Sequence, residues 1–269
     1  MNIIIITSNS IRHNYFKIMF ANRSNINVLK TYVESKTPLN LNVLTNSNLE
    51  DLNQLHFNTR HNIEYDFFSD IINNIPDKSN SLHINKGDIN SESIINEIYT
   101  LKPDLILTYG CSIIKPKLIN LFSNKIINVH LGLSPYYFGS GTNFHSLVNN
   151  ELHFFGYTFM YIDEGIDTGE IIHQSRPDVF PFDNPHQIGN RLIKNMVNDF
   201  IILVENFKLI KKITSSNKII GKTYKNRDAT IELTEKLYDN FKNNLVYKYL
   251  KSKDELINRY KLIQQEFIK

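Results

Sequence analysis

The sequence predicts an α/β fold in which helices cover both faces of a mostly parallel β-sheet. One observation is a set of short, almost wholly apolar runs, such as "NIIIIT" (2–7) and "KIINVHL" (125–131). Strands that are buried on both faces have this composition, because neither face meets water. The other observation is that helix-prone segments separate these runs, which is typical of parallel strands joined by crossover helices.

The first half of the chain contains most of the predicted sheet. Each apolar run there is bounded by polar turn residues, as in "DLILTYG" (104–110). We predict strands at 2–7, 25–33, 104–110 and 125–131, and helices at 14–22, 92–103 and 115–123. Residues 35–80 form an insertion after the second strand, and we expect it to be helical.

The second half is more strand-like at first and then helical. "FFGYTFMYI" (154–162) and "EIIHQSRPDVF" (170–180) are predicted strands joined by the loop "DEGIDTG" (163–169). Residues 182–207 contain an Asn-Pro helix start and apolar residues at helical spacing, so they predict a long helix. The pattern indicates a Rossmann-like domain at 1–213, with the insertion at 35–80, and a small helical C-terminal extension at 214–269.

Composition excludes several classes of partner. The chain of 269 residues carries 30 basic and 27 acidic residues spread along its length, so its net charge of +3 indicates neither a nucleic-acid nor a membrane partner. No stretch approaches the roughly 18 apolar residues of a membrane span, and the four-isoleucine run near the N-terminus is too short for a signal peptide. We therefore expect a cytoplasmic protein. The single cysteine, Cys111, forms no internal disulfide, and no Cys/His spacing of the zinc type predicts a metal.

Polar residues follow two of the predicted strands at the edge where parallel sheets bind ligands. "GCSIIK" (110–115) follows one strand, and "NVHLGLSPYYFGSGTN" (128–143) begins within the next. Asn128 and His130 are two positions apart, so their side chains share one side of the strand. Each residue alone is ordinary, since Asn is common at strand ends and His is often a packed ring.

Together these segments resemble the folate-dependent formyltransferase family, which includes glycinamide ribonucleotide, methionyl-tRNA and sugar N-formyltransferases. The resemblance rests on Asn128-x-His130, "LSPYYFG" (133–139), Gly156-x-Thr158 and "IDTGEII" (166–172), in that order. It is strongest over residues 80–190 and most like a sugar N-formyltransferase. It implies the formyltransferase fold and 10-formyltetrahydrofolate as the formyl donor, without a metal.

The resemblance implies catalytic roles for Asn128, His130 and Asp167. Formyl transfer to an amine passes through a tetrahedral intermediate with an oxyanion, which Asn128 and His130 would stabilise as hydrogen-bond donors. Asp167 would hold the imidazole in the required protonation state and relay the proton that leaves the amine. An Asp in "GIDTG" is otherwise a common turn former.

The resemblance also predicts the positions of the two substrates. The donor would lie between two segments, contacted by Gly110, Cys111, Ser112, Ile113 and Ile114 on one side and by Asp163 and Gly165 on the other. Tyr136 and Tyr137 would wall the acceptor pocket. Arg12 and His13 would meet an anionic group of the acceptor, or else form an exposed basic helix start. His56 and Arg60 share a predicted helix face that is either an acceptor wall or a solvated surface.

The acceptor class follows by elimination. The first strand is followed by "TSNSIRHNYF" in place of a glycine-rich phosphate loop, which argues against a purine-pathway substrate. The tail is short and helix-prone, whereas tRNA formylation in the family uses a C-terminal β-barrel. Phe138 stands where the family often has arginine. We therefore expect a nucleotide-linked amino sugar as acceptor, for lipopolysaccharide or other glycan biosynthesis.

Three alternatives remain open on the sequence. The protein could formylate another small amine, hydrolyse formyltetrahydrofolate with water as the acceptor, or bind folate without catalysis. A homodimer is compatible with the sequence, and neither a nucleic acid nor a membrane is an expected partner.

Overall fold

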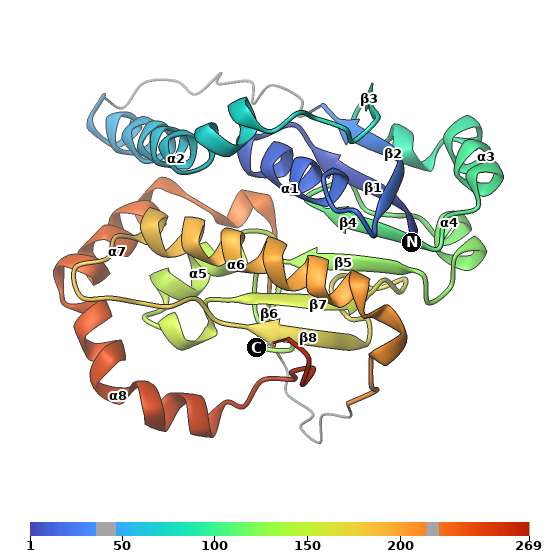
Figure 1. Ribbon diagram of the computed structural model, residues 1–269. Coiled ribbons are helices and arrows are strands. Elements are labelled where there is room, and N and C mark those ends of the chain that lie inside the picture. The colour runs from blue at the N-terminus through green and yellow to red at the C-terminus, as the bar shows by residue number, and fades with distance from the viewer. Residues whose placement is uncertain (36–46, 214–220, 269) are drawn as a thin grey trace.

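A computed structural model describes residues 1–35, 47–213 and 221–268 and shows a helix-covered β-sheet (Figure 1). The main sheet has seven strands in the order β3-β2-β1-β4-β5-β7-β8. The pairs from β3 to β5 are parallel, and β7 and β8 add an antiparallel edge. The predicted α/β class with a mostly parallel sheet is confirmed.

The elements follow one another with short connections over most of the chain. The strands are β1 (Asn2–Ser8), β2 (Asn27–Glu34), β3 (Ser81–Ile84), β4 (Leu105–Tyr109), β5 (Ile126–His130), β6 (Tyr137–Gly139), β7 (Tyr157–Tyr161), β8 (Ile171–Ser175) and β9 (Lys222–Tyr224). The helices are α1 (Ile11–Ala21), α2 (Ser47–Asn74), α3 (Glu92–Leu101), α4 (Pro116–Leu121), α5 (Thr142–Val148), α6 (Pro185–Glu205), α7 (Ile231–Lys242) and α8 (Leu245–Arg259).

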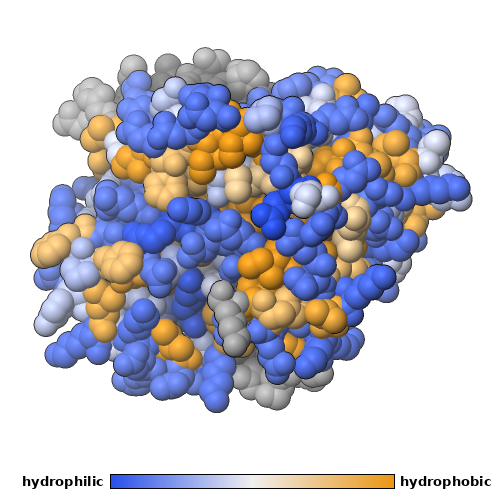
Figure 2. All heavy atoms as spheres, in the orientation of Figure 1, coloured by the Kyte–Doolittle hydropathy of each residue, from blue (hydrophilic) through white to orange (hydrophobic). Residues whose placement is uncertain are grey.

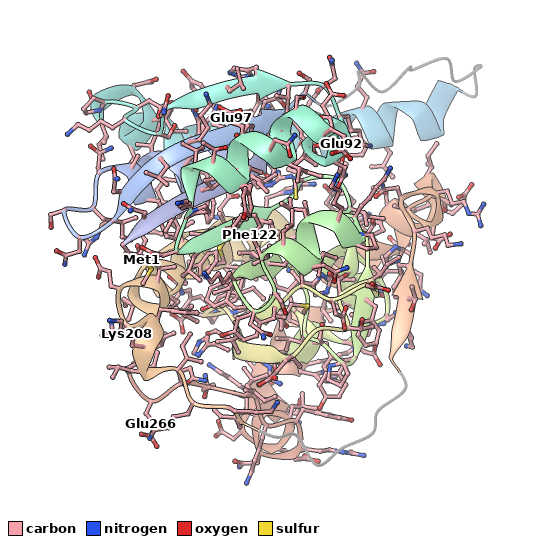
Figure 3. The ribbon with its side chains drawn as sticks, turned by 90° about the vertical axis from the view of Figure 1, so that its right-hand side faces the viewer. Met1, Glu92, Glu97, Phe122, Lys208 and Glu266 are labelled. Atoms are coloured by element: carbon pink, nitrogen blue, oxygen red, sulfur yellow. The ribbon has the colours of Figure 1, made fainter. Side chains whose placement is uncertain are left out.

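Two apolar clusters lie on opposite faces of the sheet because strand side chains alternate. Ile3 and Ile5 of β1 belong to the cluster that α1 and α6 cover, whereas Ile4 and Ile6 belong to the cluster that α3 and α4 cover. Figure 3 shows this second side, with α3 and the region of Phe122 lying over the strands. Burial on both faces explains why the strands are continuous apolar runs in the sequence.

The predicted helices and strands are present, and shorter elements were missed. α2 supplies the helix expected within residues 35–80, although 36–46 of that insertion lie outside the described residues. The long helix predicted from 182 begins at Pro185, after a capping box formed by Asn184 and Gln187. No periodic pattern predicts β3, β6, β9 or α5, because three to seven residues are too few to show one.

The C-terminal extension is mostly helical, as expected, but it also contains β9 and shares the main core. Leu237, Leu245 and Val246 from α7 and α8 are buried in the same cluster as α6. After α8, the backbone lies along the outer strand β8, where Gln174 N donates to Ile263 O at 2.7 Å. The described part of the extension therefore protects a sheet edge that would otherwise expose unpaired peptide groups.

The surface is mixed in character. Figure 2 shows small apolar groups separated by polar side chains on the face drawn in Figure 1. Across residues 1–35, 47–213 and 221–268, no helix is long and apolar enough to cross a membrane. The same described ranges contain no group of three or more His, Cys, Asp or Glu side chains placed to hold a metal ion.

Buried histidines predict that acid destabilises this fold. Burial lowers the pKa of His56, His173 and His186 to about 4. Between pH 6.5 and 4 the unfolded chain binds a proton at each of these histidines, and the folded chain does not. The free energy of unfolding therefore decreases by about 1.4 kcal/mol per histidine for each unit by which the pH is lowered.

Urea unfolding from pH 7.5 to 4.5 measures this slope. His173→Gln should flatten it by about 1 kcal/mol per pH unit, and the exposed His61→Gln control should leave it unchanged; equal slopes in both variants would contradict the assignment.

Candidate active site

Three polar side chains meet beyond the carboxyl end of β5. Asn128 and His130 lie on the side of β5 opposite Ile127 and Val129, which belong to the α1/α6 cluster. Asp167 comes from the β7–β8 loop and has a left-handed backbone, with a φ of 55°, which aspartate tolerates better than most residues. His130 Nδ1 is 3.2 Å from Asp167 Oδ2, and Asn128 Nδ2 is 3.5 Å from Asp167 Oδ1. The structure therefore brings together the three residues that the sequence singled out.

The hydrogen bonds of His130 define its tautomer. Its Nε2 lies 3.0 Å from the carbonyl oxygen of Tyr137, which only accepts, so Nε2 carries a hydrogen. In the neutral ring Nδ1 is then an unprotonated acceptor that faces a carboxylate. Burial lowers the pKa of His130, although Asp167 and the Tyr137 carbonyl both act to raise it. The neutral ring is thus ready to take up a proton at Nδ1, where Asp167 would stabilise the resulting charge.

The amide of Asn128 has a fixed orientation. Thr108 of β4, which is fully buried and pairs with Asn128 across the parallel strands, donates from Oγ1 to Asn128 Oδ1 at 2.8 Å. This bond occupies the oxygen of the amide and directs its NH₂ group away from β4. Thr108 was missed in the sequence, where the only signal is a hydroxyl at the end of an otherwise apolar strand.

The loop after β5 is shaped around the His130 ring. A Cβ on Gly132 would lie 2.6 Å from His130 Nε2 and would also overlap the Thr142 hydroxyl, so only glycine fits there. Thr158 Oγ1 donates to Gly132 O at 2.7 Å and accepts from Ser134 N at 3.1 Å. Thr158, which the sequence analysis named only as part of the Gly-x-Thr motif, therefore anchors the loop through two backbone hydrogen bonds.

Strand β6 completes the surroundings of the catalytic candidates. Gly139 N donates to Asp167 Oδ2 at 2.8 Å, and the Tyr137 carbonyl accepts from His130. Two backbone groups of one short strand therefore orient the carboxylate and the imidazole. Neither role is visible in the sequence, because backbone groups have no residue-specific signal.

The two predicted donor segments each border the α3/α4 cluster. Cys111 of one segment is partly buried against it, and so is Ile162, which precedes the loop of Asp163 and Gly165. Asp163 Oδ1 accepts from Gly165 N at 3.0 Å and from Thr168 Oγ1 at 2.8 Å, so this side chain organises its own turn. Ile114 is buried in the cluster, and the carbonyl of Ile113 accepts from Asn90 Nδ2 at 3.0 Å.

One polar atom in these segments is left for a ligand. Ser112 Oγ is buried without a hydrogen-bond partner among the described residues, whereas Ser112 N donates to Glu34 at 2.5 Å. The side chains of Ile113 and Ile166 on the two segments are 72% and 52% exposed. Gly110, with a φ of 67°, makes the tight turn next to His13 that begins the first segment.

Tyr136 and Tyr137 both pack against neighbouring side chains in this structure. Tyr137 is 1% exposed, and its hydroxyl donates to Glu151 and accepts from Asn149 Nδ2 at 3.0 Å. Tyr136 stacks on Phe154, with ring centroids 4.2 Å apart. Both rings therefore pack the loop onto its neighbours, Tyr137 fully buried and Tyr136 partly buried, and their expected contact with the acceptor stays a prediction.

Arg12 and Arg60 converge on one carboxylate. Arg12 Nη1 lies 2.8 Å and Arg60 Nε 2.9 Å from Glu64 Oε1. The Arg12 charge, followed by burial, lowers the pKa of Arg60. One carboxylate balances only one of two guanidinium charges, so the cluster retains a positive charge that favours an anion.

The hydrogen bond of His56 goes to a partner outside this ion cluster. Its Nδ1 is 2.9 Å from the Tyr238 hydroxyl, and His186 Nε2 is 3.3 Å from the same oxygen. His56 is 8% exposed. It therefore joins α2 to α6 and α7, and the solvated-face alternative is wrong for this residue. His13 lies in the site region, where its ring is centred 4.5 Å from that of Tyr109.

A family comparison agrees with this geometry. The formyl transferase family model matches residues 22–204, which is more than half of the chain. The chain belongs to the formyl transferase family. The resemblance carried by Asn128, His130 and the two loops is therefore confirmed at the level of the family.

Individual relatives are more distant. Methionyl-tRNA formyltransferase of Finegoldia magna is 28% identical over 174 residues, which cover 59% of this chain and 54% of that protein. The chain thus spans about half the length of this curated relative. Among solved structures, phosphoribosylglycinamide formyltransferase of Anaplasma phagocytophilum has a TM-score of 0.55 and 16% identity, covering 84% of this chain and 98% of that one. A sugar N-formyltransferase of a Shewanella species has a TM-score of 0.54 and 19% identity, with 85% and 78% covered. At these identities the solved structures establish the fold alone.

A single added methyl group tests the fit of the His130 ring. Gly132→Ala should lower the free energy of unfolding by about 1–3 kcal/mol, since either the His130 ring or Thr142 must move. Urea denaturation measures the change. Gly189→Ala is the matched control, because its Cβ would meet nothing closer than 4.0 Å inside α6 and should be neutral or stabilising. Equal stability of the two variants would show that the loop is not built around His130.

Proposed function

We propose that the protein transfers a formyl group from 10-formyltetrahydrofolate to the amine of a nucleotide-linked amino sugar. The observation that carries the transferase activity is the contact of Asn128 and His130 with Asp167 at the end of β5. This set provides a hydrogen-bond donor for a developing negative charge and an acceptor for a released proton. Both are needed when an amine takes a formyl group.

Asn128 is the proposed donor to the formyl oxygen. Thr108 occupies its amide oxygen, and the 3.5 Å contact from Nδ2 to Asp167 is long for a hydrogen bond. The NH₂ group is therefore available to an oxygen that gains negative charge during transfer. Stabilisation of this kind is typically worth about 100- to 1000-fold in rate.

His130 and Asp167 are the proposed proton acceptors. As the new C–N bond forms, the attacking amine must lose a proton, and the unprotonated Nδ1 of the neutral ring takes it while Asp167 stabilises the imidazolium. The bond from the formyl carbon to the folate nitrogen would then break, and that nitrogen would take the proton and leave as tetrahydrofolate. This assignment differs from the expectation that His130 donates to the oxyanion. The Nε2–H that would donate is already bonded to the Tyr137 carbonyl.

The segments 110–114 and 163–166 fit a folate. A pterin ring needs apolar contacts for its faces and polar partners for its edges, and Ile113, Ile166 and the Ser112 hydroxyl supply both. When bound, 10-formyltetrahydrofolate would supply the activated formyl group. The protein's part is to hold it beside Asn128 and His130.

The Arg12–Arg60 cluster supports an anionic acceptor. Its uncompensated charge suits a phosphate or diphosphate, which guanidinium groups bind with directed hydrogen bonds. A nucleotide-linked sugar carries such a group at a distance from its amine. Phe138, in place of the arginine common in the family, removes one cation from the acceptor loop and leaves recognition to the cluster on α1 and α2.

Removal of the catalytic groups tests the transferase activity. Asn128→Ala, His130→Ala and Asp167→Asn should each lower turnover by about 100-fold or more, because each removes a group needed as charge moves in the reaction. Formation of the formylated amine from 10-formyltetrahydrofolate is the measurement. Asp254→Asn makes the same carboxylate-to-amide change at an exposed position of α8, outside the proposed substrate segments, and should keep wild-type turnover. A His130→Ala enzyme with more than about a tenth of wild-type turnover would exclude His130 from the chemistry.

The acceptor is tested with a panel of amines. We expect product with dTDP- or UDP-linked amino sugars and none with glycinamide ribonucleotide or methionyl-tRNA. Arg60→Gln should raise the KM for the nucleotide sugar by about 10-fold or more, the typical effect of a lost charge-assisted hydrogen bond. Arg23→Gln, which breaks an exposed ion pair with Glu205, is the control and should not change KM. Product only with the other acceptors, or formate released without any amine, would refute the sugar acceptor.

A further inference from the structure

The active-site strand β6 is paired with a segment far away in the sequence. β6 (Tyr137–Gly139) and β9 (Lys222–Tyr224) form a two-stranded parallel sheet that is separate from the seven-stranded one. The pairing is extended at both ends, where Lys222 N donates to Tyr136 O and Ser140 N to Tyr224 O, each at 2.9 Å. The first strand after residues 214–220 thus lies directly against the loop that carries the candidate catalytic contacts.

The two edges of β6 have different partners. Tyr136 O and Ser140 N, on one edge, bond to β9. Tyr137 O and Gly139 N, on the other edge, bond to His130 and Asp167. Peptide groups of successive residues point to opposite edges of a strand, so this division follows from extended geometry. Any rotation of β6 about its axis would therefore break both sets of bonds together.

Side chains reinforce the pairing. The Tyr224 ring stacks on His145 with centroids 3.9 Å apart and planes 11° apart, and it lies 5.7 Å from and nearly parallel to the Tyr137 ring. Asn149 Nδ2 donates to both tyrosine hydroxyls at 3.0 Å. A Cβ on residue 139 would overlap the carbonyl oxygen of Tyr224, so the close approach of the two strands requires Gly139.

We propose that β9 is a positioning element of the active site, which holds β6 so that the Tyr137 carbonyl and the Gly139 amide orient His130 and Asp167. Among the described residues β6 pairs with no other strand, so β9 alone provides the regular hydrogen bonding that a central strand receives from its sheet. The proposal rests on formyl transfer for its kinetic test, but the orientation of His130 is measurable without any activity. Since the bonds that β9 supports orient His130 and Asp167, its loss should affect turnover more than substrate binding.

A matched pair of substitutions at Lys222 separates the backbone bond from the side chain. Lys222→Pro removes the N–H that donates to Tyr136 O, whereas Lys222→Ala keeps it and loses the exposed contact with Glu151. We expect Lys222→Pro to lower kcat by about 10- to 100-fold, as a small displacement of catalytic groups does, with KM values changed less than about threefold. Lys222→Ala should stay within about threefold of wild type.

Nitrogen NMR of ¹⁵N-histidine-labelled protein reports on His130 directly, with His130→Gln used to assign its signals. Wild type and Lys222→Ala should show a single Nε2–H tautomer, and Lys222→Pro should show a mixture of tautomers. If Lys222→Pro matches Lys222→Ala in both kcat and the spectrum, the proposal is wrong. If wild type itself forms no formylated amine, the proposed function fails, and the spectra alone decide whether β9 positions His130.

Tyr224 provides a second test that remains valid should the proline variant not fold. Tyr224→Ala removes the ring that stacks on His145, and Tyr224→Phe keeps that ring but loses the hydroxyl. We expect Tyr224→Ala to reproduce the loss in kcat and the mixed tautomers, and Tyr224→Phe to restore at least a third of wild-type kcat. A folded Tyr224→Ala with wild-type kcat and a single tautomer would overturn the proposal.

Discussion

The carboxylate of Asp167 is the group on which the rest of the site depends. It accepts from Gly139 N, faces His130 Nδ1 and lies within reach of the Asn128 amide, so one side chain ties the β7–β8 loop to β5 and β6. Its left-handed backbone turns it toward this meeting point. Without this carboxylate, neither the His130 ring nor strand β6 would have its charged partner, and a proton taken up by the ring would gain no stabilisation in a buried setting.

Burial of His130 and its pairing with Asp167 shift the pKa of the imidazole in opposite directions, and the balance of the two supports the proposed chemistry. Burial favours a neutral His130, while Asp167 favours a charged one. A ring that is neutral at rest and stabilised when protonated is suited to accept a proton during a reaction. Charge is also only partly balanced in the Arg12–Glu64–Arg60 cluster. One carboxylate is shared by two guanidinium groups, so a net positive charge remains that attracts an anion.

The described part of the C-terminal extension packs against the family domain. It contributes apolar side chains to the core, covers the outer strand β8 and pairs with β6 through β9. The family match ends at residue 204, before these contacts begin. A segment outside the family match therefore contacts the candidate active site, through backbone pairing with a strand that itself contacts the proposed catalytic residues.

The sequence by itself determined the strands of the main sheet other than β3, the long helices, and the shared side of Asn128 and His130 on β5, whereas Asp167 was indicated only by the resemblance to the formyltransferase family. Continuous apolar runs, helical spacing and a two-residue separation are local properties that follow from burial and from strand geometry. Only the tertiary structure decided that Thr108 orients Asn128, that Tyr137 is packed inside, and that β9 pairs with β6. These features depend on backbone groups and on contacts between distant segments, which leave no periodic pattern in the chain.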